Sequence, residues 1–106
     1  MKIVEYLENR IDQNINFAEM ATIFHLSVRH LNRLFKQNMG VSIGQYHEMI
    51  RLNLSKTLLK STSFSIQEIS RRVGYQDALY FSRVFKKQTK LSPQNWRKNL
   101  KTSKTD

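Results

Sequence analysis

The chain contains 106 residues, 40% of them hydrophobic, which is enough for one small domain or two small sub-cores. Its 18 basic and 8 acidic residues give a formal net charge of +10, so the expected partner is a polyanion, because phosphate neutralisation favours binding. Cysteine is absent, which excludes disulfides and thiolate chemistry and fits a cytoplasmic location, and no segment is long and apolar enough to suggest a membrane partner.

Short amphipathic helices are predicted at the beginning of the chain. Ile3, Leu7 and Ile11 are spaced as on one face of a helix that ends in the polar cluster after it. Asn16 is a typical N-cap for a short second helix, and Ser27 for a third. The first 26 residues carry two basic and four acidic residues, whereas the rest of the chain carries sixteen basic and four acidic ones. The basic surface is therefore expected to begin with the third helix.

The third predicted helix has two chemically different faces. Leu31, Leu34 and Phe35 form an apolar stripe that is expected to lie in the core. The opposite face carries basic and hydrogen-bonding side chains, namely Arg29, Asn32, Arg33 and Lys36. This pattern indicates an inward-facing seam beneath a basic outer face.

A long helix is predicted after Gly40, which stands where a helix commonly ends with a positive φ. Residues 42–45 resemble a capping box, and apolar residues then recur every four positions up to Lys60. About 18 residues rising 1.5 Å each would form a rod of roughly 27 Å.

The second half of the chain repeats the pattern of short capped helices. Ser65 is expected to cap a helix that Gly74 ends, and Asp77 to cap the next one. A Ser-Pro pair then opens a last helix that ends near Leu100. The aromatic residues expected in the core rather than on a base-stacking surface are Phe35, Phe81, Phe85 and Trp96. Because no alternating β-branched run bounded by turns occurs, the predicted fold class is all-α.

An internal repeat relates the two halves. A shift of fifty residues lays residues 33–42 on residues 83–92, with four identical positions that include Arg33 and Arg83. Each copy follows a short capped helix and a tight turn, so one supersecondary unit occurs twice. The predicted organisation is a first helix-turn-helix subdomain at 1–41, a linker helix at 42–60, a second helix-turn-helix subdomain at 61–100 and a flexible tail at 101–106.

Helix-turn-helix units with basic outer faces predict binding to double-stranded DNA. The second helix of each unit lies in the major groove, where Arg33 or Arg83 can donate two hydrogen bonds to guanine. The lysines farther along these helices, Lys36, Lys86 and Lys87, are expected to contact phosphates. Two such helices joined by a rod would meet successive major grooves, about 34 Å apart, so a monomer could bind without dimerisation.

Both halves contain motifs in a fixed order and spacing. In the second half these are Ile69, Val73-Gly74-Tyr75, Tyr80-Phe81-Ser82-Arg83, Phe85-Lys86-Lys87, Ser92-Pro93 and Trp96-Arg97. In the first half they are Ala21, Leu26-Ser27, Leu31, Arg33-Leu34-Phe35-Lys36, Gly40-Val41-Ser42, Tyr46, Arg51-Leu52 and Leu58-Leu59. From about Ile3 to Arg97, the chain resembles the DNA-binding domain of the AraC (AraC/XylS) family of bacterial transcription regulators.

The resemblance implies seven helices, with two helix-turn-helix subdomains joined by a long fourth helix, and it implies no enzyme activity, metal or cofactor. It places base-reading positions at Arg29, Asn32, Arg33, Ala78, Leu79, Ser82 and Arg83. Residues expected to contact phosphates are Ser27, Lys36, Asp77, Lys86 and Lys87. Ser55 and Ser70 depart from the alanines usual in the family. Lys90 stands where glycine commonly ends the sixth helix, which costs about 1 kcal/mol if its φ is positive.

The expected function is that of a sequence-specific transcription regulator, activator or repressor, or of its output domain. The first unit, with Arg29 and Asn32 beside Arg33, is expected to have the stricter sequence preference. The second unit, with Leu79 and Ser82 beside Arg83, is expected either to contact thymine methyl groups or mainly to anchor the domain through its lysines.

Two other functions are compatible with the sequence. One is a non-specific or architectural DNA-binding protein, and the other is a protein-interaction module that contacts RNA polymerase through the acidic first helix. The lesser alternative for Arg29 and Arg33 is that they are solvated surface charges, and the three histidines lack metal-ligand spacing. No sensing domain is evident, so the chain is expected to be either a stand-alone regulator or part of a larger one that would supply any dimerisation.

Overall fold

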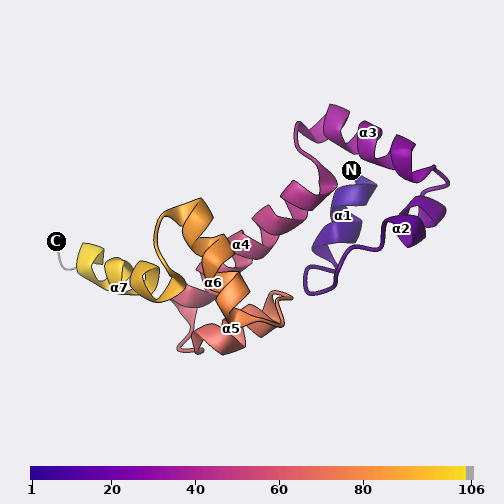
Figure 1. Ribbon diagram of the computed structural model, residues 1–106. Coiled ribbons are helices and arrows are strands. Elements are labelled where there is room, and N and C mark those ends of the chain that lie inside the picture. Colours follow the sequence, from indigo (N-terminus) through magenta and orange to yellow (C-terminus); the bar gives the residue numbers. More distant parts are fainter. Residues whose placement is uncertain (105–106) are drawn as a thin grey trace. The chain divides into compact units, whose positions relative to one another are not determined.

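The computed structural model describes residues 1–104, and the side chains of residues 1–100. The described residues form seven α-helices and no strand (Figure 1), which confirms the predicted fold class. The helices are α1 (Lys2–Glu8), α2 (Phe17–Ile23), α3 (Val28–Met39), α4 (Ile43–Ser61), α5 (Ile66–Arg72), α6 (Ala78–Thr89) and α7 (Pro93–Lys104). The backbone of residues 101–104, assigned to the tail from sequence, continues α7, and the last two residues of that tail lie outside the described part.

Two compact units make up the chain, and α4 contributes to both. The first unit is Met1–Ile50 and the second is Arg51–Asp106. The division falls inside the predicted linker helix, because each end of α4 enters a different core. Ile43 is fully buried in the first core, and Leu59 is 2% exposed in the second.

The first core collects the apolar faces of four helices. Its buried residues are Ile3, Leu7, Met20, Ala21, Leu31, Phe35 and Ile43. The helix α1 ends at Glu8, earlier than the spacing of Ile11 predicts. The amide of Asn9 bonds back to Glu5 O and Leu7 O, and residues 9–13 then continue as turns in which Gln13 N donates to Arg10 O at 3.0 Å.

The second core is built on the same plan, with the helices of the second unit. Its buried residues are Leu59, Ile69, Val73, Phe81 and Phe85. Phe85 packs edge to face on Trp96, with ring centroids 5.8 Å apart. In the first core, Phe35 packs on Tyr46 in the same way, at 5.7 Å. Phe35, Phe81 and Phe85 are at most 1% exposed, so the prediction that they are core residues is confirmed.

Two buried serines stand where the family resemblance implies alanine. The Ser55 hydroxyl donates to Leu52 O at 2.7 Å, and the Ser70 hydroxyl donates to Tyr75 O at 3.1 Å. A buried hydroxyl with a carbonyl partner avoids most of the cost of desolvation. The close packing of the helices therefore tolerates both substitutions.

Arg97 on α7 joins three parts of the second unit. Its Nε donates to Leu59 O at 3.1 Å, its Nη1 to Phe64 O at 2.8 Å and its Nη2 to Thr62 O at 3.3 Å. These carbonyls belong to the end of α4 and to the connection that follows it. A planar guanidinium suits this task, because its donors are fixed in one fork.

The helices α3 and α6 each end at a residue in the left-handed conformation. Gly40 has a φ of 79° and Lys90 a φ of 73°. Glycine adopts this conformation without steric cost, whereas a residue with a Cβ does not. The sequence predicts backbone strain at Lys90 if its φ is positive. Because its φ is positive, this strain is present.

Exchanging these two cap residues should shift stability in opposite directions. Lys90→Gly should raise the free energy of unfolding by about 0.5–1 kcal/mol, because it relieves the left-handed strain. Gly40→Lys should lower it by a similar amount, since no atom lies within 4 Å of a Cβ placed there and only backbone strain is added. Urea unfolding of the two variants beside the wild type measures both shifts, and equal signs would contradict the account.

Removing the Arg97 fork should destabilise the second unit. Arg97→Met keeps most of the side-chain volume but leaves three carbonyls without their donor, and should cost roughly 2–4 kcal/mol. Arg29→Met is the matched control, because Arg29 is exposed, and its effect should stay within about 0.5 kcal/mol. Thermal unfolding followed by circular dichroism distinguishes the two variants. A melting temperature for Arg97→Met equal to that of the control would show that the fork does not hold the unit.

Candidate nucleic-acid interface

Each unit contains a short helix, a tight turn and a longer helix. In the first unit α2 precedes α3, and in the second α5 precedes α6 (Figure 1). The turns are closed by equivalent hydrogen bonds, from Leu26 N to Ala21 O and from Tyr75 N to Ser70 O, both 2.9 Å. This arrangement is the helix-turn-helix, in which the second helix enters the DNA major groove.

The two turns differ in length by one residue. Four residues, 24–27, separate α2 from α3, whereas five residues, 73–77, separate α5 from α6. The fifty-residue shift found in the sequence therefore relates α3 to α6, while a shift of 49 relates the turn bonds of the two units. By that second shift, the left-handed residue of the first turn is His25, with a φ of 56°, and that of the second is Gly74, with a φ of 105°.

Two predicted phosphate-contacting residues are the N-caps of the longer helices. The Ser27 Oγ accepts a hydrogen bond from His30 N at 3.0 Å. The Asp77 Oδ1 accepts from Leu79 N at 2.9 Å and from Tyr80 N at 3.4 Å. Each cap satisfies amides that the helix itself leaves unpaired, and so fixes where the first turn begins.

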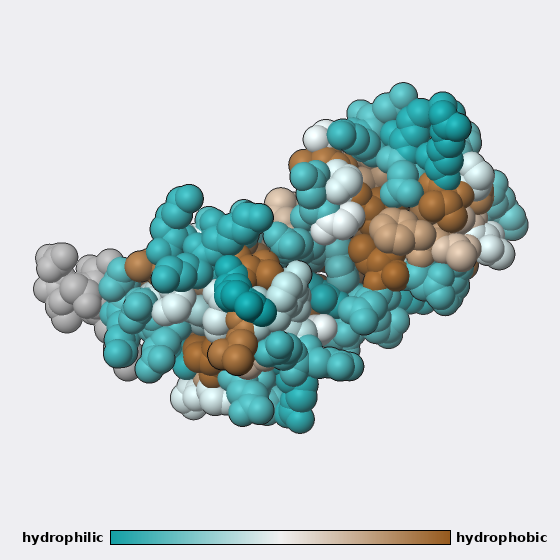
Figure 2. Space-filling view, in the orientation of Figure 1, coloured by the Kyte–Doolittle hydropathy of each residue, from teal (hydrophilic) through white to brown (hydrophobic). Residues whose placement is uncertain are grey.

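The outer face of α3 is polar and exposed. Arg29, Arg33 and Lys36 are exposed, while the side chains between them, Leu31 and Phe35, are fully buried. Hydrophilic side chains cover the region of α3 in the space-filling view (Figure 2). The structure therefore places these three predicted residues together on one accessible helix face.

Asn32 lies on the same helix but is half-buried. Its Nδ2 donates to Val28 O, one turn earlier, at 3.1 Å. A bidentate contact of an asparagine with adenine needs both the amide nitrogen and the amide oxygen. The Nδ2 amide carries two hydrogens, so one can bond Val28 O while the second hydrogen and Oδ1 remain available to a base.

The outer face of α6 has a different chemical character. Leu79 is 76% exposed in the first turn, where the fifty-residue shift places Arg29 in α3. Arg83, Lys86 and Lys87 are also exposed, whereas Ala78 and Ser82 are half-buried. The second unit thus presents an apolar side chain where the first presents a guanidinium.

Tyr80 is a surface residue of α6 to which the sequence interpretation gave no role. It is 50% exposed and lies between Leu79 and the buried Phe81. The Cζ of Arg83 lies over its ring, 6.0 Å from the centroid. Its position beside a core residue of an amphipathic helix was the signal that could have identified it as exposed.

Two further arginines are engaged within the protein. Arg71 Nη2 lies 2.5 Å from Glu68 Oε1, and Arg72 Nε lies 2.8 Å from Glu68 Oε2. The hydrogen bond from Arg71, aided by that from Arg72, lowers the pKa of the Glu68 carboxyl from its ordinary value. The charges at the end of α5 are thereby partly neutralised.

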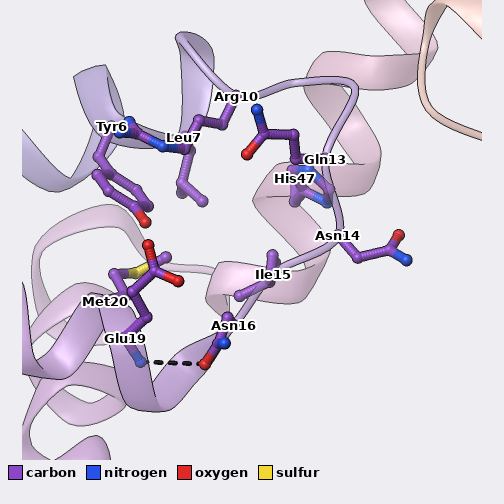
Figure 3. A pocket seen from close by; sticks show the side chains of 10 residues that line it. All are labelled: Tyr6, Leu7, Arg10, Gln13, Asn14, Ile15, Asn16, Glu19, Met20 and His47. Carbon is purple, nitrogen blue, oxygen red and sulfur yellow. Dashed lines mark hydrogen bonds between the residues drawn. The ribbon is translucent and has the colours of Figure 1, made fainter.

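A small cavity lies in the first unit beside the start of α2 (Figure 3). Its volume is about 40 Å³, and the side chains around it include Tyr6, Arg10, Gln13, Glu19, Met20 and His47. The amide of Glu19 at its edge donates to Asn16 Oδ1 at 3.0 Å, which caps α2. The space is large enough for only a few water molecules, whereas pockets for organic ligands are usually about 300 Å³ or more.

Neither a membrane-spanning helix nor a metal cluster occurs in the described part of the chain. None of its helices is long and apolar enough to cross a bilayer. No three histidine, aspartate or glutamate side chains there are grouped so that they could hold a metal ion.

Known proteins share this arrangement. The sequence model of a helix-turn-helix domain family matches residues 20–99. The arabinose operon regulatory protein of Escherichia coli (strain K12) is 39% identical over 94 residues, which cover 88% of this chain and 32% of that protein. The C-terminal domain of AraT, a response regulator from Geobacillus stearothermophilus, is 32% identical, with a TM-score of 0.87, over 92% of this chain and 82% of that chain.

A second solved structure is a transcriptional regulator from Chromobacterium violaceum described as containing an AraC-type DNA-binding domain. It is 31% identical, with a TM-score of 0.80, over 89% of this chain and 84% of that chain. The chain spans about a third of the length of the curated relatives it matches. By sequence, fold and paired helix-turn-helix units, the chain belongs to the AraC family of bacterial transcription regulators.

Proposed function

We propose that this chain is the sequence-specific DNA-binding part of a transcription regulator and that it catalyses no reaction. The observation that carries the proposal is the construction of α3 and α6. Each has a cap that fixes its first turn, a buried phenylalanine that holds it to a core, and exposed arginine and lysine side chains on its outer face. Such a helix can enter a major groove as a rigid body.

In the first unit, Arg29, Asn32 and Arg33 would read bases. An arginine can donate two hydrogen bonds to guanine, and an asparagine can bond adenine through its amide oxygen and the second hydrogen of its amide nitrogen. All three have hydrogen-bonding side chains, so this unit would carry the stricter sequence preference.

In the second unit, Leu79 and Arg83 would be the principal readers, with Ala78 and Ser82 beside them. The exposed side chain of Leu79 has no hydrogen-bonding group, and the apolar feature of the major groove is the 5-methyl group of thymine. We therefore propose a thymine in the half-site that α6 occupies.

Phosphate contacts would come from exposed lysines and from the capped helix starts. Lys36, Lys86 and Lys87 would bind as cations, and the Ser27 hydroxyl can still donate its proton to a phosphate while it caps α3. The Asp77 carboxylate repels a phosphate, so any contact at Asp77 would use its backbone amide. These contacts position the helices without reading sequence.

The whole regulator would act in the cytoplasm on double-stranded DNA. The two helix-turn-helix units of one chain would occupy successive major grooves, so a monomer can bind, and dimerisation, if any, would be through a further domain. RNA polymerase is a further partner that we propose, through the acidic residues of α1. The arabinose operon regulatory protein, by its name a regulator of transcription, supports the proposed role as a transcription regulator.

Loss of Arg33 or Arg83 should weaken binding to a specific DNA sequence more than binding to random DNA. Arg33→Ala and Arg83→Ala should each weaken binding to a duplex selected from a randomised pool by about 1–3 kcal/mol, because a bidentate base contact is lost. Binding to a random-sequence duplex should change much less. Fluorescence anisotropy at fixed salt with both duplexes provides the comparison.

Lys56→Ala serves as the control for that experiment. Lys56 lies on α4 and belongs to neither α3 nor α6. Its loss should change the affinity for the two duplexes by the same factor. If the arginine variants also weakened both duplexes alike, base reading by Arg33 and Arg83 would be wrong. A randomised selection that returned no consensus would instead favour the non-specific alternative.

Replacing thymine by deoxyuridine in the selected duplex should reveal the role of Leu79. Deoxyuridine lacks the 5-methyl group but keeps the same hydrogen-bonding groups, so one position should weaken wild-type binding by roughly 1 kcal/mol. Leu79→Ala should bind the two duplexes almost equally. Because Leu79 is 76% exposed, the substitution should leave the melting temperature unchanged. Wild-type binding that is insensitive to deoxyuridine throughout the half-site would rule out a methyl contact.

A further inference from the structure

A run of side-chain contacts crosses the second unit from α4 to the outer face of α6. Arg51 on α4 is only 5% exposed, and its Cζ lies 5.0 Å from the centroid of the Tyr75 ring. The Tyr75 ring lies 5.9 Å from that of Tyr80, tilted by 53°. The Cζ of Arg83 lies 6.0 Å from the centroid of Tyr80. Two neighbouring tyrosine rings thus lie between two guanidinium groups, that of the buried Arg51 and that of the exposed Arg83.

The inner part of this run is held firmly. Tyr75 follows Gly74, whose left-handed φ of 105° turns the chain between α5 and α6. Its ring also packs on Phe81, with centroids 5.6 Å apart, and Phe81 is 1% exposed. The Tyr75 ring is therefore packed against a residue of the second core.

The outer part is accessible. Tyr80 is 50% exposed and sits one helical turn before Arg83, so its ring and the arginine side chain share one helix face. A guanidinium within about 6 Å of an aromatic ring is attracted by the negative charge of the ring face. The contact restricts a side chain that otherwise has many rotamers, and ordering it beforehand reduces the entropy lost on binding.

We propose that Tyr80, supported by Tyr75, is a positioning residue that orients Arg83 for the DNA. The proposal rests on the proposed function, in which Arg83 reads a base. Tyr80 acts through Arg83 and need not contact DNA itself. The fifty-residue shift that relates α6 to α3 places His30 at the corresponding position, so this tyrosine is particular to the second unit.

The first test measures the order of Arg83 in the protein without DNA. Relaxation of the Arg83 side-chain Nε–H group by ¹⁵N NMR should show a more restricted guanidinium in the wild type and in Tyr80→Phe than in Tyr80→Leu. Phenylalanine keeps the ring, whereas leucine removes it and keeps an apolar side chain. The Nε–H group of Arg33 is the internal reference and should be the same in all three proteins. Equal mobility of Arg83 in the wild type and Tyr80→Leu would overturn the proposal.

The second test measures recognition with a double-mutant cycle. The probes are a duplex selected from a randomised pool by the wild-type chain and a random-sequence duplex. Tyr80→Leu should reduce the ratio of the two affinities by about two- to fivefold, the size expected of an exposed cation–π contact, and Tyr80→Phe should restore it. In an Arg83→Ala background, Tyr80→Leu should have no further effect on the ratio.

The outcomes separate the positioning role from its alternatives. A loss from Tyr80→Leu that persists in the Arg83→Ala background would show that Tyr80 contacts DNA directly, and would overturn the proposal. An Arg83→Ala variant with unchanged recognition would instead refute base reading by Arg83, and only the relaxation measurement would then bear on the contact. Circular dichroism of Tyr80→Leu should show the wild-type helix content and melting temperature, so that misfolding cannot produce the loss.

Discussion

The packing of one buried phenylalanine against one aromatic residue holds each recognition helix in place. Phe35 lies edge to face on Tyr46, and Phe85 does so on Trp96, with centroids 5.7 and 5.8 Å apart. Such pairs contribute about 0.5–1.5 kcal/mol beyond the area they bury. In a small unit this is a substantial fraction of the stability, and it acts on the face directly opposite the exposed arginines. The orientation of the outer faces of α3 and α6 depends on this contact.

Much of the fold could be predicted because the relevant signals are local. The residues Asn16, Ser27, Ser65 and Asp77 cap the helices that the sequence assigned to them, since a cap bonds amides only two or three residues away. The all-α class and the core positions of Phe35, Phe81 and Phe85 followed from the sequence pattern, whereas Trp96, also expected in the core, is half-buried against it. The end of α1 did not, because Asn9 and the turns after it stop the helix although Ile11 continues the apolar pattern.

The candidate site was predictable to a smaller extent. Exposure of Arg29, Arg33 and Leu79 follows from helical periodicity, and the structure agrees. The bond from Asn32 to Val28 O and the contact of Tyr80 with Arg83 could not be inferred, because each depends on a rotamer. The buried Arg51 beside Tyr75 depends on two segments meeting in space, for which one sequence gives no direct signal.

The extra residue in the second turn has a consequence for how such units can be recombined. Because the recognition helices correspond under a shift of fifty and the turn bonds under a shift of 49, the register changes between Leu26 and Ser27 in one unit and between Tyr75 and Asp77 in the other. An exchange of reading helices between the units should therefore join the segments at the caps, with 27–40 replaced by 77–90. A junction within the turn would lengthen or shorten the turn by one residue. The turn is fixed by its left-handed residue and by the hydrogen bond that closes it, so a change in its length would disrupt both. The cap is thus the natural boundary of an interchangeable module.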